Sequence, residues 1–269
     1  MSDSVYIHGT DPAEQSRLAA FNELVNDSFL SFLDLNCATT ILEVGSGLGV
    51  LTREVARRFP NAQVTGIELS ESQLAQAREH SQSNLDLVQG DATQLPFAEA
   101  AFDVVYCRWV LEHLANPAAA LTEILRVLKP GGRFFIDEVD VSSQRYDPPT
   151  PAFDHAWQAV TRLQKKLGGD NLLGSKLPRL LMSTGFTEVE AIAEPAVYQS
   201  GTAEFETWIN NERAIIKGCA EELASHDLLT DDEMAAAFAE LNELKSREDA
   251  TSWYCWFRAT GVRPYPTVY

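Results

Sequence analysis

Short apolar segments alternate with longer amphipathic ones along the first half of the chain. The apolar segments are rich in Val, Ile and Leu, which is typical of strands buried on both faces, and most precede a helix-start signal. The predicted strands span residues 41–44, 63–68, 85–89, 102–107 and 133–137, and the predicted helices span 51–59, 70–80 and 117–128. Strands that alternate with helices in this way predict a parallel sheet.

A further helix is predicted ahead of the first strand, from Pro12 to about Leu33. Asp11 can cap this helix, and proline suits its first position. We expect the helix to pack over the mouth of a ligand site.

The pattern changes after Glu138. A proline-rich link at 147–151 leads into predicted helices at 152–167 and 176–183, and the later predicted elements are an edge strand at 189–193, helices at 203–224 and 231–245, and a last strand at 253–257. Thr230 and Glu233 form a capping-box pattern ahead of the last helix.

The whole pattern predicts an α/β fold, a Rossmann-like doubly wound and mostly parallel sheet with an N-terminal helix and a helical substrate-side insertion. A length of 269 residues suits a single domain. We expect residues 1–40 to form an N-terminal helical lid, 41–140 the cofactor-binding core, and 141–269 the substrate-side helices and C-terminal strands.

The composition of the chain limits the classes of partner to be expected. The net charge is −18, which argues against a nucleic acid or an anionic membrane, so a small molecule is the expected partner. The four cysteines and five histidines show no metal-ligand spacing, and burial is the expected role of most cysteines. No signal-peptide pattern and no membrane-length apolar run occurs, and we therefore expect a cytoplasmic protein.

The junction between the first strand and the next helix carries the first candidate chemistry. Residues 41–49 read I-L-E-V-G-S-G-L-G, an apolar strand that runs into alternating glycines. Glycines permit close approach of a ligand, and the following helix directs its first amides at the turn. A dinucleotide fingerprint requires glycine at position 50, where Val50 stands, and no Gly-Lys-Ser/Thr of a P-loop follows.

Other strand ends add polar residues at the same predicted edge of the sheet. Glu68 ends the second strand, where a carboxylate can accept from both hydroxyls of a ribose. Asp91 follows the third strand, and the fourth ends at Cys107, Arg108 and Trp109. Taken alone, Glu68 reads as a solvated strand end and Asp91 as a turn former; together they indicate a nucleoside site.

These segments resemble the class I S-adenosylmethionine-dependent methyltransferases, in the branch of small-molecule and ubiquinone-type methyltransferases. Five motifs carry the resemblance in the family's order: E-V-G-S-G-L-G, I-E-L-S, G-D-A-T-Q-L-P-F, F-D-V-V-Y-C-R-W-V-L-E-H-L and L-K-P-G-G-R-F-F-I-D. A short leader, Y-I-H-G followed by E-Q-S-R-L, is similar to that of some members.

The resemblance implies S-adenosyl-L-methionine as the cofactor. No metal is expected, because the cysteines and histidines lack metal-ligand spacing. The implied cofactor-binding residues are Tyr6, Arg17, Glu43, Gly45, Ser46, Gly47, Gly49, Glu68, Leu69, Asp91, Ala92, Arg108 and Trp109. The glycine turn would wrap the methionine part, Glu68 the ribose, and Asp91 with Ala92 the adenine edge, while Leu69 covers an adenine face. Arg17 either pairs with the cofactor's carboxylate or lies on a solvated helix face.

The catalytic residues are less defined by the sequence. His113 follows the fourth strand and is a weak candidate for a base, because the Glu-His pair at this place is usually structural in the family. His155 is a second histidine, and the acids Asp137, Glu138 and Asp140 could bind a cationic amine or pair with an arginine. Phe153 and Trp157 share a helix face and form a candidate pocket lid, with Trp208, Trp253 and Trp256 as further candidate walls.

We therefore expect methyl transfer from S-adenosylmethionine to an oxygen, nitrogen or carbon atom of a small-molecule acceptor. Two alternatives remain at this point. One is a non-catalytic S-adenosylmethionine-binding protein that acts through a partner, and the other is a nicotinamide-dependent oxidoreductase, which Val50 disfavours.

Overall fold

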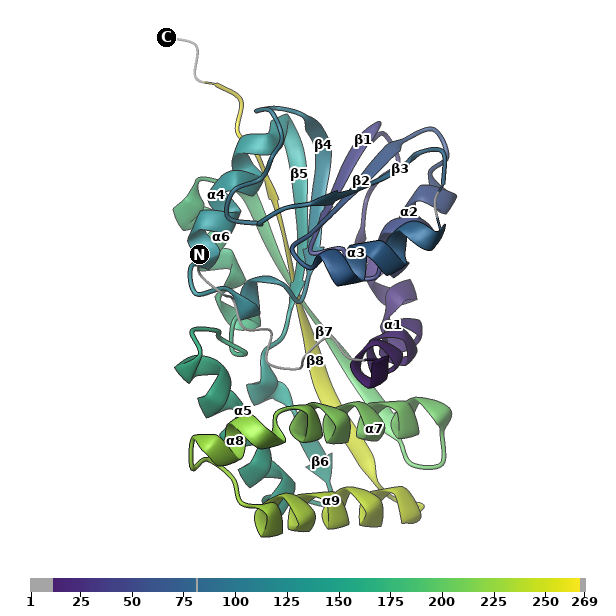
Figure 1. Cartoon of the computed structure of the whole chain (residues 1–269). Coiled ribbons are helices and arrows are strands. Elements are labelled where there is room, and N and C mark those ends of the chain that lie inside the picture. Colours follow the sequence, from purple (N-terminus) through teal and green to yellow (C-terminus); the bar gives the residue numbers. More distant parts are fainter. Residues whose placement is uncertain (1–11, 81, 267–269) are drawn as a thin grey trace.

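The computed structural model describes residues 12–80 and 82–266 and contains an eight-stranded sheet (Figure 1). The strands are β1 (Thr40–Val44), β2 (Gln63–Glu68), β3 (Leu85–Gln89), β4 (Phe102–Arg108), β5 (Leu128–Glu138), β6 (Arg145–Asp147), β7 (Thr187–Gln199) and β8 (Thr251–Val262). The helices are α1 (Pro12–Phe32), α2 (Val50–Arg58), α3 (Glu71–Ala77), α4 (Pro117–Val127), α5 (Pro151–Lys166), α6 (Leu177–Thr184), α7 (Ala203–Gly218), α8 (Ala220–Ser225) and α9 (Asp231–Ser246).

The strand order is β3-β2-β1-β4-β5-β8-β6, and β7 pairs with β8. Strands β1 to β5 are parallel, and β8 runs antiparallel to β5. The order reverses direction at β1, so the carboxyl ends of β1 and β4 part there and leave a crevice. The expected Rossmann-like, doubly wound and mostly parallel sheet is confirmed.

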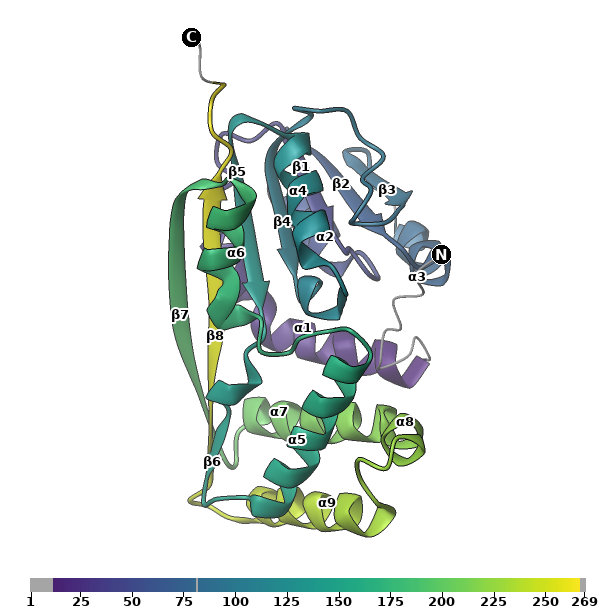
Figure 2. The same ribbon diagram turned by 90° about the vertical axis from the view of Figure 1, so that its left-hand side faces the viewer.

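Helices cover both faces of this sheet (Figure 2). On one face, buried residues of α1 and α2 pack against Ile41, Val104 and Phe135. On the other, buried residues of α4 and α6 pack against Leu42 and Val105. Successive strand residues thus serve opposite faces, and burial on both explains why these strands are apolar throughout.

A separate helical layer lies beyond the sheet, where α5, α7, α8 and α9 share their own buried cluster. The long strands β7 and β8 run from the sheet to this layer (Figures 1 and 2). Helix α1 links the two parts, since its Phe21 belongs to the helical cluster and its Phe29 to the sheet cluster. Residues from both parts can therefore meet between them.

The structure differs from the predicted elements mainly in the second half. The predicted strand at 189–193 is the edge strand β7, but it spans Thr187–Gln199. Pro195 lies within it, as an edge strand allows, because the missing amide donor need not face a neighbour. The predicted helix at 203–224 is two helices that meet at Cys219. The predicted capping box of Thr230 and Glu233 is present.

Candidate functional site

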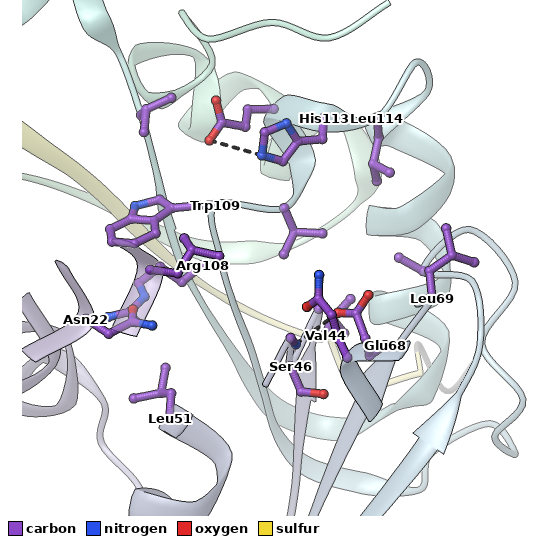
Figure 3. A pocket seen from close by; sticks show the side chains of 18 of the residues that line it. Asn22, Val44, Ser46, Leu51, Glu68, Leu69, Arg108, Trp109, His113 and Leu114 are labelled. Carbon is purple, nitrogen blue, oxygen red and sulfur yellow. Dashed lines mark hydrogen bonds and ion pairs between the residues drawn. The ribbon is translucent and has the colours of Figure 1, made fainter. Parts of the chain in front are cut away.

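A cavity of about 820 Å³ opens at the carboxyl ends of β1, β2 and β4, next to α1, α5 and α7 (Figure 3). It brings together most of the cofactor residues implied by the sequence. Those that line it are Arg17, Glu43, Gly45, Ser46, Gly47, Glu68, Leu69, Asp91, Ala92, Arg108 and Trp109. Gly49 does not line the cavity, and Tyr6 lies outside the described residues.

The glycine turn is fixed by the end of β2. The backbone amides of Gly45 and Ser46 both donate to the carbonyl of Ile67, at 2.8 and 2.9 Å. Gly45 has a φ of +74°, and a Cβ there would lie 2.4 Å from a methyl carbon of Val110, so only glycine fits. Gly49 has a φ of +68° and begins α2; its role is to turn the backbone rather than to form the wall.

Glu68 links the turn to the next helix. Its Oε2 accepts from the amide of Gly47 and its Oε1 accepts from the amide of Ser70, both at 2.9 Å. Leu69 beside it is 51% exposed, which is unusual for a leucine that lines a cavity and suits an apolar face of a ligand. The carboxylate is thus held in place at the cavity wall before any ligand binds.

Asp91 is oriented by its own turn. Its Oδ1 accepts from the amide and the hydroxyl of Thr93, at 2.8 and 2.7 Å. Among the described residues, no group donates a hydrogen bond to its Oδ2, which leaves an acceptor at the cavity. The turn-forming role and the ligand-binding role therefore coexist in one carboxylate.

Glu43 lies buried beneath the glycine turn. It accepts hydrogen bonds from the hydroxyl of Thr52 and, at 3.0 Å, from that of Tyr106. Burial raises the pKa of Glu43 to about 7, against the lowering effect of the Thr52 hydrogen bond and the Arg108 charge. Its contacts make it a support for the turn that also reaches the cavity.

Arg108 presents an unused donor. Its Nη2 donates to the side-chain oxygens of Asn22 and Asn26 on α1, at 2.5 and 2.8 Å, but its Nη1 is buried and has no hydrogen-bond partner among the residues that the structure describes. Burial lowers the pKa of Arg108, and the nearby Asp137 and Glu43 oppose that effect. An arginine nitrogen without a partner in a cavity calls for an anionic or carbonyl oxygen from a ligand.

The remaining wall of the cavity is aromatic. Its rings come from α1, the end of β4, α5, α7 and β8: Phe21, Trp109, Trp157, Trp208, Tyr254 and Trp256. Several are in contact with one another, with ring centroids 5.7 Å apart for Trp109 and Trp256 and 4.7 Å apart for Tyr254 and Trp256. The indole nitrogens of Trp109 and Trp157 are buried without partners.

This wall also contains one buried acid that the sequence interpretation missed, Glu212 of α7. Glu212 is 3% exposed, and within residues 12–80 and 82–266 its Oε2 has no hydrogen-bond partner. Burial raises the pKa of Glu212 to about 8, against the lowering effect of the Gln144 and Asn211 side chains and of the Arg17 charge. Nothing in its sequence neighbourhood distinguishes it from a surface glutamate, because its burial depends on helices distant in the chain.

His113 lines the cavity, and its Nε2 lies 3.6 Å from Oε1 of Glu112 (Figure 3). The other oxygen of Glu112 accepts from Gln164 of α5 at 3.0 Å. The segment that carries both residues is fixed by the buried Glu138, which accepts from the amides of Val110 and Leu111 at 3.0 and 2.7 Å. The Glu-His pair thus takes part in a structural network at the rim of the cavity.

Other sequence candidates lie elsewhere. Asp137 and Asp140 are buried and do not line the cavity. Asp137 forms an ion pair with Arg258 at 2.9 Å, so for this acid the alternative of pairing with an arginine holds. His155 is half exposed and pairs with Glu233 at 3.3 Å. Of the predicted lid pair, Trp157 lines the cavity and Phe153 is buried against it, with ring centroids 5.5 Å apart.

Three absences hold for residues 12–80 and 82–266. No three or more His, Cys, Asp or Glu side chains are grouped to hold a metal ion. No helix has the length and apolar character needed to cross a membrane. The cysteines form no disulfide; Cys107 and Cys219 are buried, Cys255 is half-buried and Cys37 is exposed.

Comparison with known proteins places this geometry in context. Residues 42–136 match a family described as "Methyltransferase domain". An uncharacterized 37.1 kDa protein in transposon Tn4556 of Streptomyces fradiae is 31% identical over 84% of this chain and 64% of its own length. A ubiquinone/menaquinone biosynthesis C-methyltransferase of Roseobacter denitrificans is 30% identical over 55% of this chain and 61% of its own length. The chain thus spans about three fifths of these two relatives.

Among solved structures, one from Bacillus halodurans, titled as that of a proposed methyltransferase, has a TM-score of 0.58. It is 21% identical, and the match covers 89% of this chain and 99% of that one. At this identity the likeness establishes the fold, and the chemistry has to be argued from the side chains.

Proposed function

Because the chain belongs to the class I S-adenosylmethionine-dependent methyltransferases, we propose that it transfers a methyl group from this cofactor to a small molecule. The observation that carries the proposal is the meeting of the glycine turn, Glu68, Asp91 and Arg108 in one cavity. S-adenosylmethionine is the methyl donor of this family.

The residues present fit the parts of this cofactor. The fixed carboxylate of Glu68 would accept from the ribose hydroxyls, and Oδ2 of Asp91 from the exocyclic amine of adenine. The backbone amide of Ala92 would donate to an adenine ring nitrogen, and the exposed side chain of Leu69 would cover one face of that ring. The glycine turn would lie against the methionine part, where a larger residue at Gly45 would clash with Val110.

Two arginines are candidates for the cofactor's carboxylate. Arg17 lines the cavity but donates to Asn211 of α7. Arg108 retains a buried Nη1 without a partner, which a carboxylate would satisfy. We therefore assign the carboxylate to Arg108, with Arg17 as part of the link between α1 and α7.

The bound cofactor supplies a methyl group that its sulfonium makes electrophilic. The chain's own contribution is to hold the acceptor in line with that group and to exclude water. The aromatic wall and helices α5 and α7 would do so. His113 stays a weak candidate for a base, because its placement beside Glu112 suits a structural histidine equally well.

Calorimetry with S-adenosylmethionine and with NAD tests the cofactor. We expect S-adenosylmethionine to bind and NAD not to bind, because the turn has Val50 where a dinucleotide fingerprint has its third glycine. Binding of NAD alone would favour the oxidoreductase alternative.

Incubation with methyl-labelled cofactor and a metabolite extract tests turnover. We expect the label in a small molecule, identified by mass spectrometry. Cofactor binding with consistent absence of labelled product would favour the non-catalytic binding protein instead.

A further inference from the structure

Part of the cavity, which we call the acceptor chamber, is lined by Trp109, Gln144, Trp157, Trp208, Glu212, Tyr254 and Trp256. Of these residues, Trp109 alone is among the implied cofactor-binding residues. These residues come from both the sheet and the helical layer, so the chamber exists only when the two parts pack together. Its chemical character bears on the methyl acceptor.

The chamber contains one acid with an unused oxygen. Oε2 of Glu212 is buried and has no hydrogen-bond partner among the described residues, while the side chains of Gln144 and Asn211 lie near enough to lower its pKa. A buried polar atom without a partner is costly, by ~1–3 kcal/mol, and is retained where a ligand supplies the missing contact. For the ionised carboxylate, the missing contact is a hydrogen-bond donor or a positive charge.

The aromatic rings around this acid favour the positive charge. Ring faces attract cations, and a carboxylate among several indoles combines two modes of cation binding. An uncharged apolar acceptor would leave Oε2 of Glu212 without a partner, whereas an ammonium group satisfies both the oxygen and the rings. Arg108 already lies over Trp109, with its guanidinium carbon 4.5 Å from the ring centroid, so this ring binds one cation from outside the chamber.

We propose that the methyl acceptor is a small amine, and that Glu212 binds its ammonium group and removes the proton that must leave before methyl transfer. This inference rests on the proposed methyltransferase function and deepens it by naming the acceptor atom as nitrogen. Glu212 is then a catalytic residue, since it contacts the reacting nitrogen.

The proton and electron balance is simple. The ammonium nitrogen gives one proton to the Glu212 carboxylate and regains its lone pair. That lone pair forms the bond to the methyl carbon, while the electrons of the carbon–sulfur bond remain on sulfur, which becomes a neutral thioether. The product is a methylated ammonium ion, which leaves while Glu212 keeps the proton. The one proton lost per turnover is the proton that Glu212 releases when the next ammonium ion binds.

The environment of Glu212 suits this exchange. Burial raises the pKa of Glu212 to about 8. Three charged or titratable groups face it: Arg17 of α1 lowers its pKa, and Tyr146 of β6 and Tyr254 of β8 have their own pKa values raised in part by its charge. Near pH 7 the empty chamber thus holds Glu212 mainly protonated. A bound cation stabilises the ionised form, so binding of a permanent cation should release roughly one proton.

Choline and its uncharged isostere 3,3-dimethylbutan-1-ol test the inference without requiring turnover. Both are titrated into the full-length protein with S-adenosylhomocysteine present, and tryptophan fluorescence reports occupancy of the chamber. We expect choline to bind at least tenfold more tightly than the isostere and to release a proton near pH 7. Equal binding of the two, or binding of neither, would overturn the inference.

Glu212→Gln removes the charge and keeps the shape, and Glu206→Gln on the exposed side of the same helix is the matched control. We expect Glu212→Gln to weaken choline binding at least tenfold and to abolish proton release, with S-adenosylhomocysteine affinity retained and the melting temperature not lowered. Unchanged choline binding in this variant contradicts the role of Glu212. If the wild-type protein does not bind S-adenosylhomocysteine at all, that result contradicts the proposed function instead. Failure of the amine proposal and failure of the proposed function therefore give different results.

Discussion

Replacement of Glu68 by glutamine isolates the contact on which the nucleoside pose depends. Glu68 holds the amides of Gly47 and Ser70, one on each carboxylate oxygen, both at 2.9 Å. Glutamine keeps one acceptor oxygen and puts a donor in place of the other, so one amide and one ribose hydroxyl lose an acceptor. A hydrogen bond to a charged group contributes ~1.5–3 kcal/mol, so we expect cofactor affinity to fall by roughly 10- to 150-fold.

Calorimetry with S-adenosylhomocysteine and with its 2′,3′-dideoxy analogue separates the ribose contact from distortion of the turn. We expect Glu68→Gln to weaken binding of S-adenosylhomocysteine strongly and binding of the dideoxy analogue much less. The difference between the two losses measures the coupling between Glu68 and the ribose hydroxyls, as in a double-mutant cycle. Glu71→Gln, an exposed acid three residues along the chain, is the control and should change neither affinity. Equal losses for both ligands would show that Glu68 only shapes the turn, and no loss for either would refute the pose.

Three further predictions concern stability. Gly45→Ala should destabilise the protein by ~2–4 kcal/mol in urea unfolding, because a Cβ would lie 2.4 Å from a valine methyl carbon. Gly201→Ala is the control, since this glycine also has a positive φ but nothing lies within 4 Å of its Cβ, and it should cost only ~1–2 kcal/mol. Equal costs would show that the contact with the valine is not the cause. Arg258→Ala leaves the buried Asp137 without its ion-pair partner at 2.9 Å and should lower the free energy of unfolding by ~3–5 kcal/mol. Adding Asp137→Asn should restore part of this stability, because it removes the unpaired charge. No gain in stability from the second substitution would show that the charge is not the cause. Burial raises the pKa of Glu212 from 4.5 to about 8, so the stability that this group contributes is full below pH 4.5 and is lost as the pH rises through 8. Glu212→Gln should therefore be more stable than wild type at pH 9, by up to about 5 kcal/mol. A variant whose stability depends on pH as the wild type does would contradict this.

The sheet and its cofactor edge could be predicted because their signals are local. The strands at 63–68 and 85–89 have the predicted bounds, since each apolar run lies between turn residues. Glu68 and Asp91 could be placed together because parallel strands bring their carboxyl ends to one edge of a sheet. The motifs follow one another along the chain as β1, β2, β3 and β4, whereas the strands lie side by side in the order β3-β2-β1-β4.

The acceptor chamber could not be predicted in the same way. Glu212 reads as one more charged residue on a helix, and it is buried because α7 packs against elements distant in the chain, among them α1 and β7. The length of β7 was underestimated because Pro195 marks an ending in a central strand but not in an edge strand. Contacts between distant segments, which no local pattern encodes, decide both cases.

A crystal structure with S-adenosylhomocysteine and an amine bound would show both the cofactor site and the acceptor chamber occupied. We expect the ribose hydroxyls on Glu68, the adenine amine at Oδ2 of Asp91 and the carboxylate at Nη1 of Arg108. We also expect the amine nitrogen to lie between the cofactor's sulfur and the carboxyl group of Glu212. A cofactor bound away from Glu68 and Asp91, or an acceptor whose nitrogen points away from Glu212, would contradict this arrangement.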